Sequence, residues 1–456
     1  MEEKKIKHVC QNCGWEGSKW HGRCPQCSSW NSIVEELQPL SSSGKRFSLG
    51  SKDSVPLPFS KIAKDSLQRY PSGLTEFDRV LGGGLTPGAF ILLGGDPGIG
   101  KSTLLLQVCG NLAKKYKTLY ISAEESARQT ALRANRLKVD HSNLLFFSEG
   151  SLEKILHQSE RNKPEVMVVD SIQTIYLDSL PSAPGTVSQV RESASRLMSY
   201  AKSCGIAIFI VGHVTKEGSL AGPRVLEHLV DTVLSFEGDA HYSFRILRST
   251  KNRFGPSNEI AVFEMGDGGL EEITNPSRVF LREKSEDRIG SSVFTAMEGS
   301  RPLLCEIQAL TVSSYLSIPR RTALGVDLNR IQMVAAVLDK YMGTELGKRD
   351  LFVNLAGGLK ITEPASDLAV ALAILSSRYK KPLHRQTCFF GELGLTGELR
   401  ACRFSRERVK EAEKLGFQEI YLPKSVQSYL KKDKFKIKLN FKDHLEEFSF
   451  FKTKLD

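Results

Sequence analysis

Residues 94–103 read Gly-Gly-Asp-Pro-Gly-Ile-Gly-Lys-Ser-Thr, and this stretch decides the fold of the domain around it. An apolar run, residues 90–93, stands before it, and a helical pattern begins after it at Leu104. A strand, a glycine-rich loop and a helix form the context of a phosphate-binding loop, and residues 95–102 fit its spacing, G-x-x-x-x-G-K-[S/T]. The sequence therefore predicts that the chain binds a nucleoside triphosphate, which we take to be ATP.

The loop's residue types suit phosphate recognition. Glycines let backbone N–H groups turn toward phosphate oxygens, and the N-terminus of the following helix favours negative charge. We expect Lys101 to reach the β- and γ-phosphates and Ser102 to offer its hydroxyl to Mg²⁺. The expected nucleotide-binding residues are Gly95, Asp96, Pro97, Gly98, Ile99, Gly100, Lys101, Ser102 and Thr103.

Length and composition limit the remaining possibilities. A chain of 456 residues is long enough for two or three domains. Its formal net charge of +11 favours a polyanionic partner, although a basic surface also serves solubility. Neither a run of 18 apolar residues nor an apolar signal-peptide core is found, so we expect no membrane span and a cytoplasmic location.

Four of the nine cysteines lie in the first 27 residues, as two C-x-x-C pairs: Cys10, Cys13, Cys24 and Cys27. Two such pairs can surround Zn²⁺ with four thiolates, and the metal would stabilise a module too short to fold alone. A redox pair or disulfides are the alternatives, and a cytosolic compartment disfavours them. We expect a C4 zinc finger at residues 1–34, covered by the protein's three tryptophans: Trp15, Trp20 and Trp30. Whether it contacts DNA, another protein or its own chain stays open.

A linker and a large domain follow the finger. Residues 35–58 contain a serine run and three prolines, which predicts a flexible linker. Over residues 59–275, apolar runs alternate with helical patterns, which predicts a mostly parallel sheet flanked by helices. The expected strands are Phe90–Leu93, Thr118–Ser122, Val166–Asp170, Ala207–Val211, Thr232–Phe236 and Phe244–Leu247.

Two acidic residues follow strand-like runs of this domain. Asp170 ends an apolar strand, where it would hold Mg²⁺ directly or through water. Glu124 follows the expected strand Thr118–Ser122 and would activate the attacking water as a general base. The alternative for Glu124 and Glu125 is that acidic residues favour the first turn of a helix.

Two loops are candidates for nucleic-acid contact. His213 follows the strand at 206–211, where it would sense the γ-phosphate. A glycine-rich, basic segment comes after His213 and runs to residue 224. Residues 176–189 form a second loop after Asp170. Mobile basic loops often track a nucleic-acid backbone, and ordinary surface loops are the alternative.

The order of the C-x-x-C pairs, the phosphate loop and the pentapeptide Lys251-Asn252-Arg253-Phe254-Gly255 resembles the RadA (Sms) family of bacterial DNA repair proteins. The resemblance runs along essentially the whole chain. It implies a RecA-like core that assembles into a homo-hexameric ring around single-stranded DNA, like replicative helicases of the DnaB type. It also implies branch migration of branched recombination intermediates, with the RecA recombinase as protein partner.

Lys251 and Arg253 alternate along an expected strand end, so we expect both to face one side. In a ring they would reach a neighbour's nucleotide as trans-acting cations, or they would grip the DNA backbone. Exposed cations at a turn without a function are the remaining alternative.

The C-terminal part of the chain contains the stretches Gly325-Val326-Asp327, Asp350–Asn354, Glu363–Ala369 and Gly391–Glu398. With these stretches, residues 276–456 resemble the proteolytic domain of Lon, whose catalysis uses a serine and a lysine. Ala365 stands at the serine position and Arg406 at the lysine position. Alanine offers no nucleophile and arginine keeps its proton, while Ser366 lies one residue along. We expect an inactive protease fold that serves as a ring scaffold.

The predicted fold class is α/β: a RecA-like P-loop core, an N-terminal zinc module and a C-terminal α+β Lon protease-like domain. The predicted function is a DNA-dependent ATPase and helicase that uses ATP, Mg²⁺ and Zn²⁺. A recombination mediator that uses ATP only to switch its assembly state is the alternative. The expected catalytic residues are Lys101, Glu124, Asp170, Lys251 and Arg253.

Overall fold

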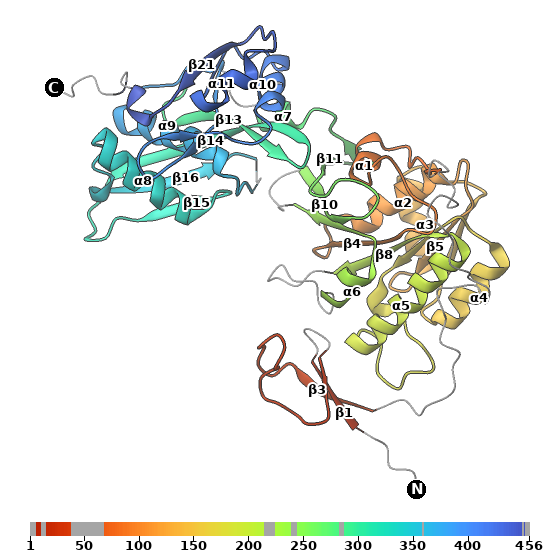
Figure 1. Ribbon diagram of the computed structural model, residues 1–456. Coiled ribbons are helices and arrows are strands. Elements are labelled where there is room, and N and C mark those ends of the chain that lie inside the picture. The colour runs from red at the N-terminus through yellow and green to blue at the C-terminus, as the bar shows by residue number, and fades with distance from the viewer. Residues whose placement is uncertain are drawn as a thin grey trace, which may run out of the picture. The chain divides into compact units, whose positions relative to one another are not determined.

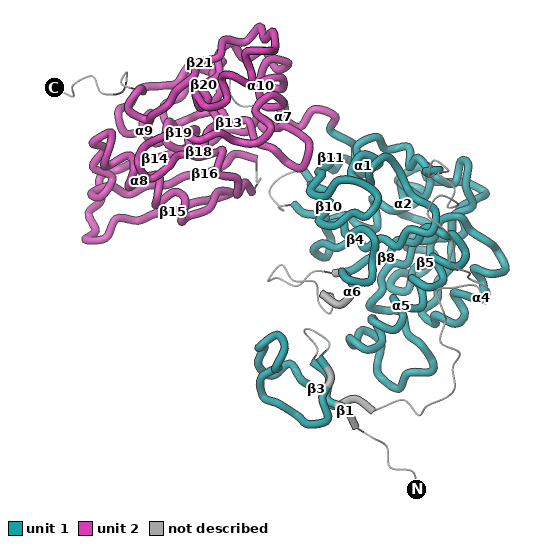
Figure 2. Tube along the Cα trace, viewed as in Figure 1, with its two compact units in different colours: residues 1–273 teal, residues 274–456 magenta. Residues whose placement is uncertain are grey.

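The computed structural model describes residues 6–10, 15–37, 68–213, 224–238, 244–281, 287–357, 360–448 and 451. The chain divides into two compact units, residues 1–273 and 274–456 (Figure 2). The expected boundary between residues 275 and 276 falls two residues beyond this division. We describe each unit by itself.

The N-terminal module is a three-stranded antiparallel sheet in the order β2-β1-β3. Its strands are β1 (Ile6–Cys10), β2 (Glu16–Gly17) and β3 (Ile33–Leu37). Strand β3 therefore includes three residues that we expected in the linker, and the rest of the linker, residues 38–58, lies outside the described residues.

The tryptophans of this module do not share one role. The small core consists of Cys10, Cys24 and Ile33, with Trp15 packed against it. In contrast, Trp20 is 57% exposed and Trp30 is 70% exposed. The expectation that all three tryptophans cover the module is therefore wrong for two of them, because thiols and a single indole already fill so small a core.

Residues 68–273 form a nine-stranded sheet. Six of its strands are parallel, in the order β9-β4-β8-β7-β5-β6. Their bounds are β4 (Phe90–Gly95), β5 (Thr118–Ser122), β6 (Leu144–Ser148), β7 (Val166–Asp170), β8 (Ala207–His213) and β9 (Thr232–Glu237). The prediction of a mostly parallel sheet is confirmed.

An antiparallel extension continues the sheet beyond β9. It consists of β10 (Phe244–Asn252), β11 (Ile260–Gly266) and β12 (Gly269–Glu272). Strand β10 has an irregularity between Ser249 and Lys251, where its pairing with β9 shifts by one residue. The sequence reading missed β6, β11 and β12, whose short runs carry no motif.

Helices cover both faces of this sheet (Figure 1). They are α1 (Thr75–Val80), α2 (Lys101–Leu112), α3 (Ala127–Arg136), α4 (Leu152–Asn162), α5 (Val187–Cys204) and α6 (Arg224–Leu229). Side chains alternate along a strand, so Ile91 and Leu93 of β4 pack with α1 and α2, while Phe90 and Leu92 pack with α4 and α5. Strand β4 is thereby buried on both faces, which makes it a rigid support for the loop that follows it.

The second unit is built on a seven-stranded mixed sheet in the order β15-β16-β14-β13-β17-β20-β21. Its strands are β13 (Ser291–Glu298), β14 (Arg301–Ser313), β15 (Arg321–Leu324), β16 (Arg349–Leu355), β17 (Thr387–Phe389), β20 (Glu419–Pro423) and β21 (Lys438–Lys442). A separate small pair joins β18 (Glu392–Leu393) to β19 (Leu399–Arg400). The helices are α7 (Pro276–Phe280), α8 (Leu328–Met342), α9 (Asp367–Tyr379), α10 (Ser405–Lys414) and α11 (Gln427–Leu430).

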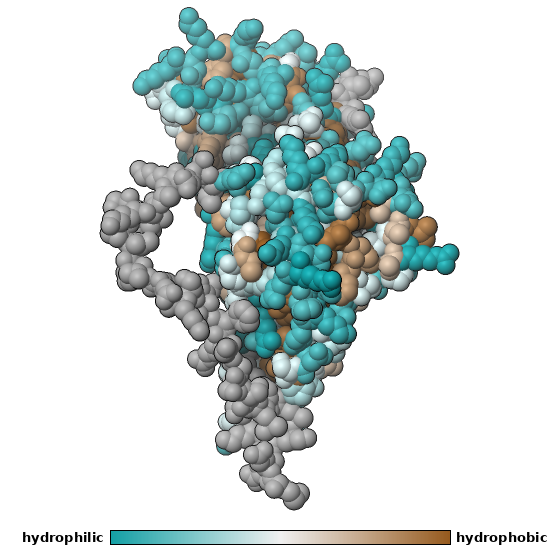
Figure 3. Space-filling model, turned by 90° about the vertical axis from the view of Figure 1, so that its right-hand side faces the viewer, coloured by the Kyte–Doolittle hydropathy of each residue, from teal (hydrophilic) through white to brown (hydrophobic). Residues whose placement is uncertain are grey.

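The face drawn in Figure 3 is largely hydrophilic, and hydrophobic residues appear on it only in small groups. Within the part of the chain that the structure describes, no helix combines the length and the apolar character that crossing a membrane requires.

Candidate ATPase site

The carboxyl ends of the parallel strands bring the expected site residues together. The phosphate loop follows β4, Glu124 follows β5 and Asp170 ends β7. In register, Ser122 pairs with Asp170, while Gly95 pairs with His213, whose side chain lies outside the described part. Ligands of such sheets bind beyond the carboxyl ends of the strands, so the topology gathers these groups at the expected edge.

The phosphate loop has a backbone that other residues would not tolerate. Gly95 has φ +158° and Gly100 has φ +113°. A Cβ added at Gly95 would lie 2.4 Å from the carbonyl oxygen of Phe236, and Gly100 directly precedes the first residue of α2. These glycines therefore allow the loop to curl directly into the helix, which is the geometry that presents N–H groups to a phosphate.

Lys101 is buried inside this loop. Its Nζ donates to the carbonyl oxygens of Gly95 at 2.8 Å and of Asp96 at 2.9 Å. Burial lowers the pKa of Lys101, and the carboxylates of Asp170 and Glu124 act in the opposite direction. The ammonium group is thus within electrostatic reach of both acids that the sequence assigns to the site.

Asp170 is held by two hydroxyl groups. The Tyr120 hydroxyl donates to Asp170 Oδ2 at 2.6 Å, and Ser102 contributes a second side-chain hydrogen bond. Burial raises the pKa of Asp170, and these two hydrogen bonds oppose the rise. A carboxylate beside a P-loop serine hydroxyl is the oxygen donor set that Mg²⁺ takes in P-loop ATPases, so the residues fit this metal.

Sequence reasoning missed Tyr120, although the residue stands in β5, the strand that Glu124, the expected general base, follows. Its phenol ring belongs to the core and is 2% exposed. Only the pairing of β5 with β7 brings its hydroxyl to Asp170.

Glu124 points to the site, and its neighbour does not. The Ser171 hydroxyl donates to Glu124 Oε1, whereas Glu125 pairs with Arg133 of α3 at 2.5 Å. Helix α3 begins after Ser126, which forms a capping box with Gln129, and its first turn contains no acidic residue. The alternative that acidic residues occupy the first turn of this helix is therefore wrong, although Glu125 does contact α3 through Arg133.

The pentapeptide directs both of its cations at one segment of the chain. Lys251 Nζ donates to the carbonyl oxygen of Glu227 in α6 at 2.6 Å. Arg253 Nη1 lies 3.5 Å from Asp231 Oδ1, just beyond α6, and the Arg253 side chain is 61% exposed. Lys251 lies in β10 and Arg253 stands one residue beyond the end of this strand at Asn252, and both cations contact the segment of residues 227–231, in agreement with the expectation that they face one side.

The other residues of the pentapeptide fix its backbone. Asn252 Oδ1 accepts from the Phe254 N–H at 2.9 Å, and its amide donates to the carbonyl oxygen of Val80 at 3.3 Å. A Cβ added at Gly255 would lie 2.6 Å from the Cα of Gly82, so the two backbones are in direct contact. The pentapeptide thus presents its cations from a backbone held on the segment that follows α1.

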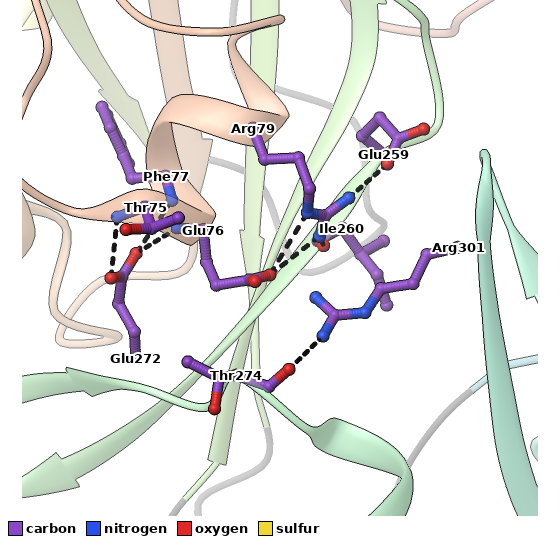
Figure 4. Close-up of polar contacts among 9 residues, drawn as sticks. All are labelled: Thr75, Glu76, Phe77, Arg79, Glu259, Ile260, Glu272, Thr274 and Arg301. Carbon is purple, nitrogen blue, oxygen red and sulfur yellow. Dashed lines mark hydrogen bonds and ion pairs between the residues drawn. The ribbon is translucent and has the colours of Figure 1, made fainter. Parts of the chain in front are cut away.

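Figure 4 shows how α1 itself is held. The Glu272 carboxylate, at the end of β12, accepts the backbone N–H groups of Thr75, Glu76 and Phe77 at 2.9, 2.6 and 3.0 Å. Later in the helix, the Arg79 guanidinium donates to Glu259 and to Glu76. The contacts with Glu272 and Glu259 fix α1 on β12 and on the start of β11, and sequence reasoning had no signal for them because these partners lie far apart in the chain.

The N-terminal thiols are arranged for a metal ion. The Sγ atoms of Cys10, Cys24 and Cys27 lie within 4.8 Å of one another, and those of Cys10 and Cys27 are 3.7 Å apart. Tetrahedral Zn²⁺ with bonds of about 2.3 Å separates its sulfur ligands by about 3.8 Å. The three thiols therefore fit zinc, and Cys13, the expected fourth ligand, lies outside the described residues.

The second unit lacks a nucleophile and base pair at the expected protease positions. Ala365 lies in the 3-10 turn Pro364–Ser366, and the Ser366 hydroxyl donates to the carbonyl oxygen of Glu363 at 2.9 Å. Arg406 bonds to Asp433 at 2.7 Å. The nearby hydroxyl and guanidinium are thus each engaged in another contact.

A buried arginine pins this unit instead. Arg408 is 1% exposed and donates to both carboxylate oxygens of Glu363. Its guanidinium lies 5.8 Å from the ring centre of Phe294 and 5.6 Å from that of Phe390. The ion pair between Arg408 and Glu363 joins α10 to the chain just before Ala365 and so stabilises the fold of this unit.

Three family models match separate parts of the chain. Residues 8–35 match a rubredoxin metal binding domain, residues 58–219 match an AAA domain, and residues 326–426 match the subunit ChlI of Mg-chelatase.

Curated relatives match along nearly the whole chain. The "DNA repair protein RadA" of Listeria monocytogenes is 50% identical over 424 residues, 93% of this chain and 93% of the relative. The proteins of that name from Streptococcus pyogenes serotype M6 and Bacillus subtilis are also 50% identical, over 425 and 427 residues; both alignments cover 93% of this chain, and 94% and 93% of the respective relatives. Among solved structures, the KaiC-like protein PH0186 of Pyrococcus horikoshii aligns at 20% identity with a TM-score of 0.39, over 45% of this chain and 99% of that one.

Proposed function

Because the chain belongs to the family of the DNA repair protein RadA, we propose that it is a DNA-dependent ATPase and helicase of recombinational repair. It works as a hexameric ring on single-stranded DNA and promotes branch migration of recombination intermediates. The observation that carries the proposal is the meeting of Lys101, Asp170 and Glu124 at one edge of the sheet. Family membership supports a cytoplasmic location and the RecA recombinase as protein partner.

Each site residue has a task in ATP hydrolysis. Lys101 binds the β- and γ-phosphates, and Ser102 with Asp170 holds Mg²⁺, which when bound neutralises charge on those phosphates. Glu124 takes a proton from the water whose oxygen attacks the γ-phosphorus, and the bond to the β-phosphate oxygen breaks to leave ADP and phosphate. The hydrogen bond from Ser171 holds the Glu124 carboxylate in place for this step.

The pentapeptide supplies charge to a second subunit. Lys251 and Arg253 sit on a fixed backbone, and Arg253 is largely exposed, as a cation that acts on another molecule must be. In a ring these cations reach the neighbour's nucleotide and stabilise the transition state as an arginine finger does. The second unit holds the subunits in register and has no protease activity, which Ala365 and the engaged Arg406 support.

Strand displacement on forked DNA with ATP tests the proposal. We expect ATP-dependent unwinding by the native chain, and at least a tenfold loss in Lys101→Ala and in Arg253→Ala. Arg161→Ala, which removes an exposed arginine from α4, is the control and should unwind normally. A native chain that hydrolyses ATP and binds DNA but displaces no strand would contradict the motor and favour an ATP-switched mediator.

A further inference from the structure

Asp231 joins three elements of the ATPase domain. Its carboxylate is buried and accepts the backbone N–H of Phe90 at 3.0 Å. The same carboxylate pairs with Lys202 of α5 and with Arg253 of the pentapeptide. No sequence motif marks this residue, because its partners lie between 22 and 141 positions away.

The backbone of Asp231 repeats two of these connections. Its N–H donates to the carbonyl oxygen of Phe90 at 2.8 Å, and its carbonyl oxygen accepts the N–H of Arg253 at 3.1 Å. Phe90 is the first residue of β4, the strand that ends in the phosphate loop. Asp231 therefore ties the exposed cation of the pentapeptide to the strand that carries the subunit's own nucleotide site.

We propose that Asp231 is a positioning residue for ATP hydrolysis, which holds the Arg253 guanidinium in the direction that reaches a neighbouring subunit's nucleotide. This inference rests on the proposed trans-acting role of Arg253. Asp231 touches no nucleotide itself and acts through Arg253 alone.

Electrostatics explains why a carboxylate is needed at this point. Lys202, Arg253 and Lys251 converge here, and Lys202 Nζ also lies 5.8 Å from the ring centre of Phe254. The pKa of Lys251 is lowered by burial and, secondarily, by Arg253, which places these two cations within mutual reach. Without the negative charge of Asp231, repulsion turns the exposed Arg253 side chain away from its native direction.

Steady-state kinetics of DNA-stimulated ATP hydrolysis tests this coupling. The amide in Asp231→Asn keeps an acceptor for Phe90 but loses the charge. We expect kcat to fall at least tenfold while KM for ATP stays within twofold. The double variant with Arg253→Ala should be no more than twofold worse than Arg253→Ala alone, because both act through one group. Losses that multiply in the double variant would overturn the proposal.

Mixed rings separate positioning from damage to the phosphate loop. Lys101→Ala subunits keep an intact pentapeptide, and Asp231→Asn subunits keep an intact loop, so a one-to-one mixture should hydrolyse ATP faster than either variant alone. Arg253→Ala mixed with Lys101→Ala is the reference. A gain in the reference but not with Asp231→Asn would overturn the proposal. No gain in either mixture would refute the trans role of the pentapeptide, and the proposal for Asp231 would fall with it.

Thermal unfolding checks that the variants fold. If Asp231→Asn does not fold, Asp231→Glu is the second variant, because it keeps the negative charge. Asp231→Glu should retain at least a third of the native kcat. A folded Asp231→Glu variant whose kcat is as low as that of Arg253→Ala would overturn the proposal. Glu192→Gln, which removes an exposed carboxylate from the helix of Lys202, is the control and should match the native chain.

Discussion

The hydroxyl group of Tyr120 helps to orient Asp170, the carboxylate expected to hold Mg²⁺. Tyr120→Phe removes this hydrogen bond and preserves the buried ring. We expect a loss of about 1 kcal/mol in Mg²⁺ affinity, so that half-maximal ATPase activity needs roughly fivefold more Mg²⁺. Saturating Mg²⁺ should restore most of kcat.

A Mg²⁺ titration of ATP hydrolysis measures this effect. Tyr116→Phe, at a ring packed against Tyr70 in the same domain, is the control and should titrate like the native chain. An unchanged half-maximal concentration in Tyr120→Phe would show that Asp170 needs no help from the phenol.

At the scale of residues, the sequence predicted what is local. The phosphate loop is contiguous, and its glycines and Lys101 obey one spacing, so their roles follow from the sequence alone. Tyr120 and Asp231 were missed because their partners arrive from other strands, and nothing in the surrounding sequence marks them.

At the scale of elements, the first turn of α1 depends on a residue from β12. Glu272→Ala leaves the N–H groups of Thr75, Glu76 and Phe77 without their carboxylate acceptor. Loss of such a cap costs about 1–2 kcal/mol in the free energy of unfolding. Glu271→Ala, at the exposed neighbouring position, should cost less than about 0.5 kcal/mol.

Denaturant unfolding of both variants, followed by circular dichroism, measures these costs. Equal midpoints would mean that water replaces the carboxylate at α1 without loss. The sequence offered no signal for this cap, since Glu272 ends β12, a short strand that the pattern of apolar residues had not indicated.

At the scale of the whole molecule, the alternation of apolar runs and helices predicted five of the six parallel strands of the sheet and missed β6. The antiparallel strands β11 and β12 were missed as well, because they follow β10 without a helix between them and so lie outside that alternation. The second unit was expected from the resemblance to Lon alone, and its boundaries stay a prediction.

When zinc is removed, the N-terminal module should unfold while the rest of the chain stays folded. All three tryptophans lie there, so tryptophan emission reports on this module only. A strong chelator should shift the emission to the red as Trp15 leaves the core, because a module this small depends on its metal. ATP hydrolysis without DNA should change less than twofold, since its residues belong to the nine-stranded sheet.

Readdition of Zn²⁺ should reverse the shift, and a chelator-free incubation is the control. Emission that stays constant after complete removal of the metal would show that the thiols and Trp15 hold together without it.

The contact between Gly82 and Gly255 bears on how the family changes over evolutionary time. Each glycine lies where a Cβ on the other would approach its Cα to less than 3 Å, so neither position can acquire a side chain while its partner keeps its place. We expect a saturation mutagenesis screen to find both intolerant, even though they are 173 positions apart. If Gly255, the last residue of the pentapeptide, is invariant in the family, the cause would then be a steric constraint between two backbones and not a role in ATP hydrolysis.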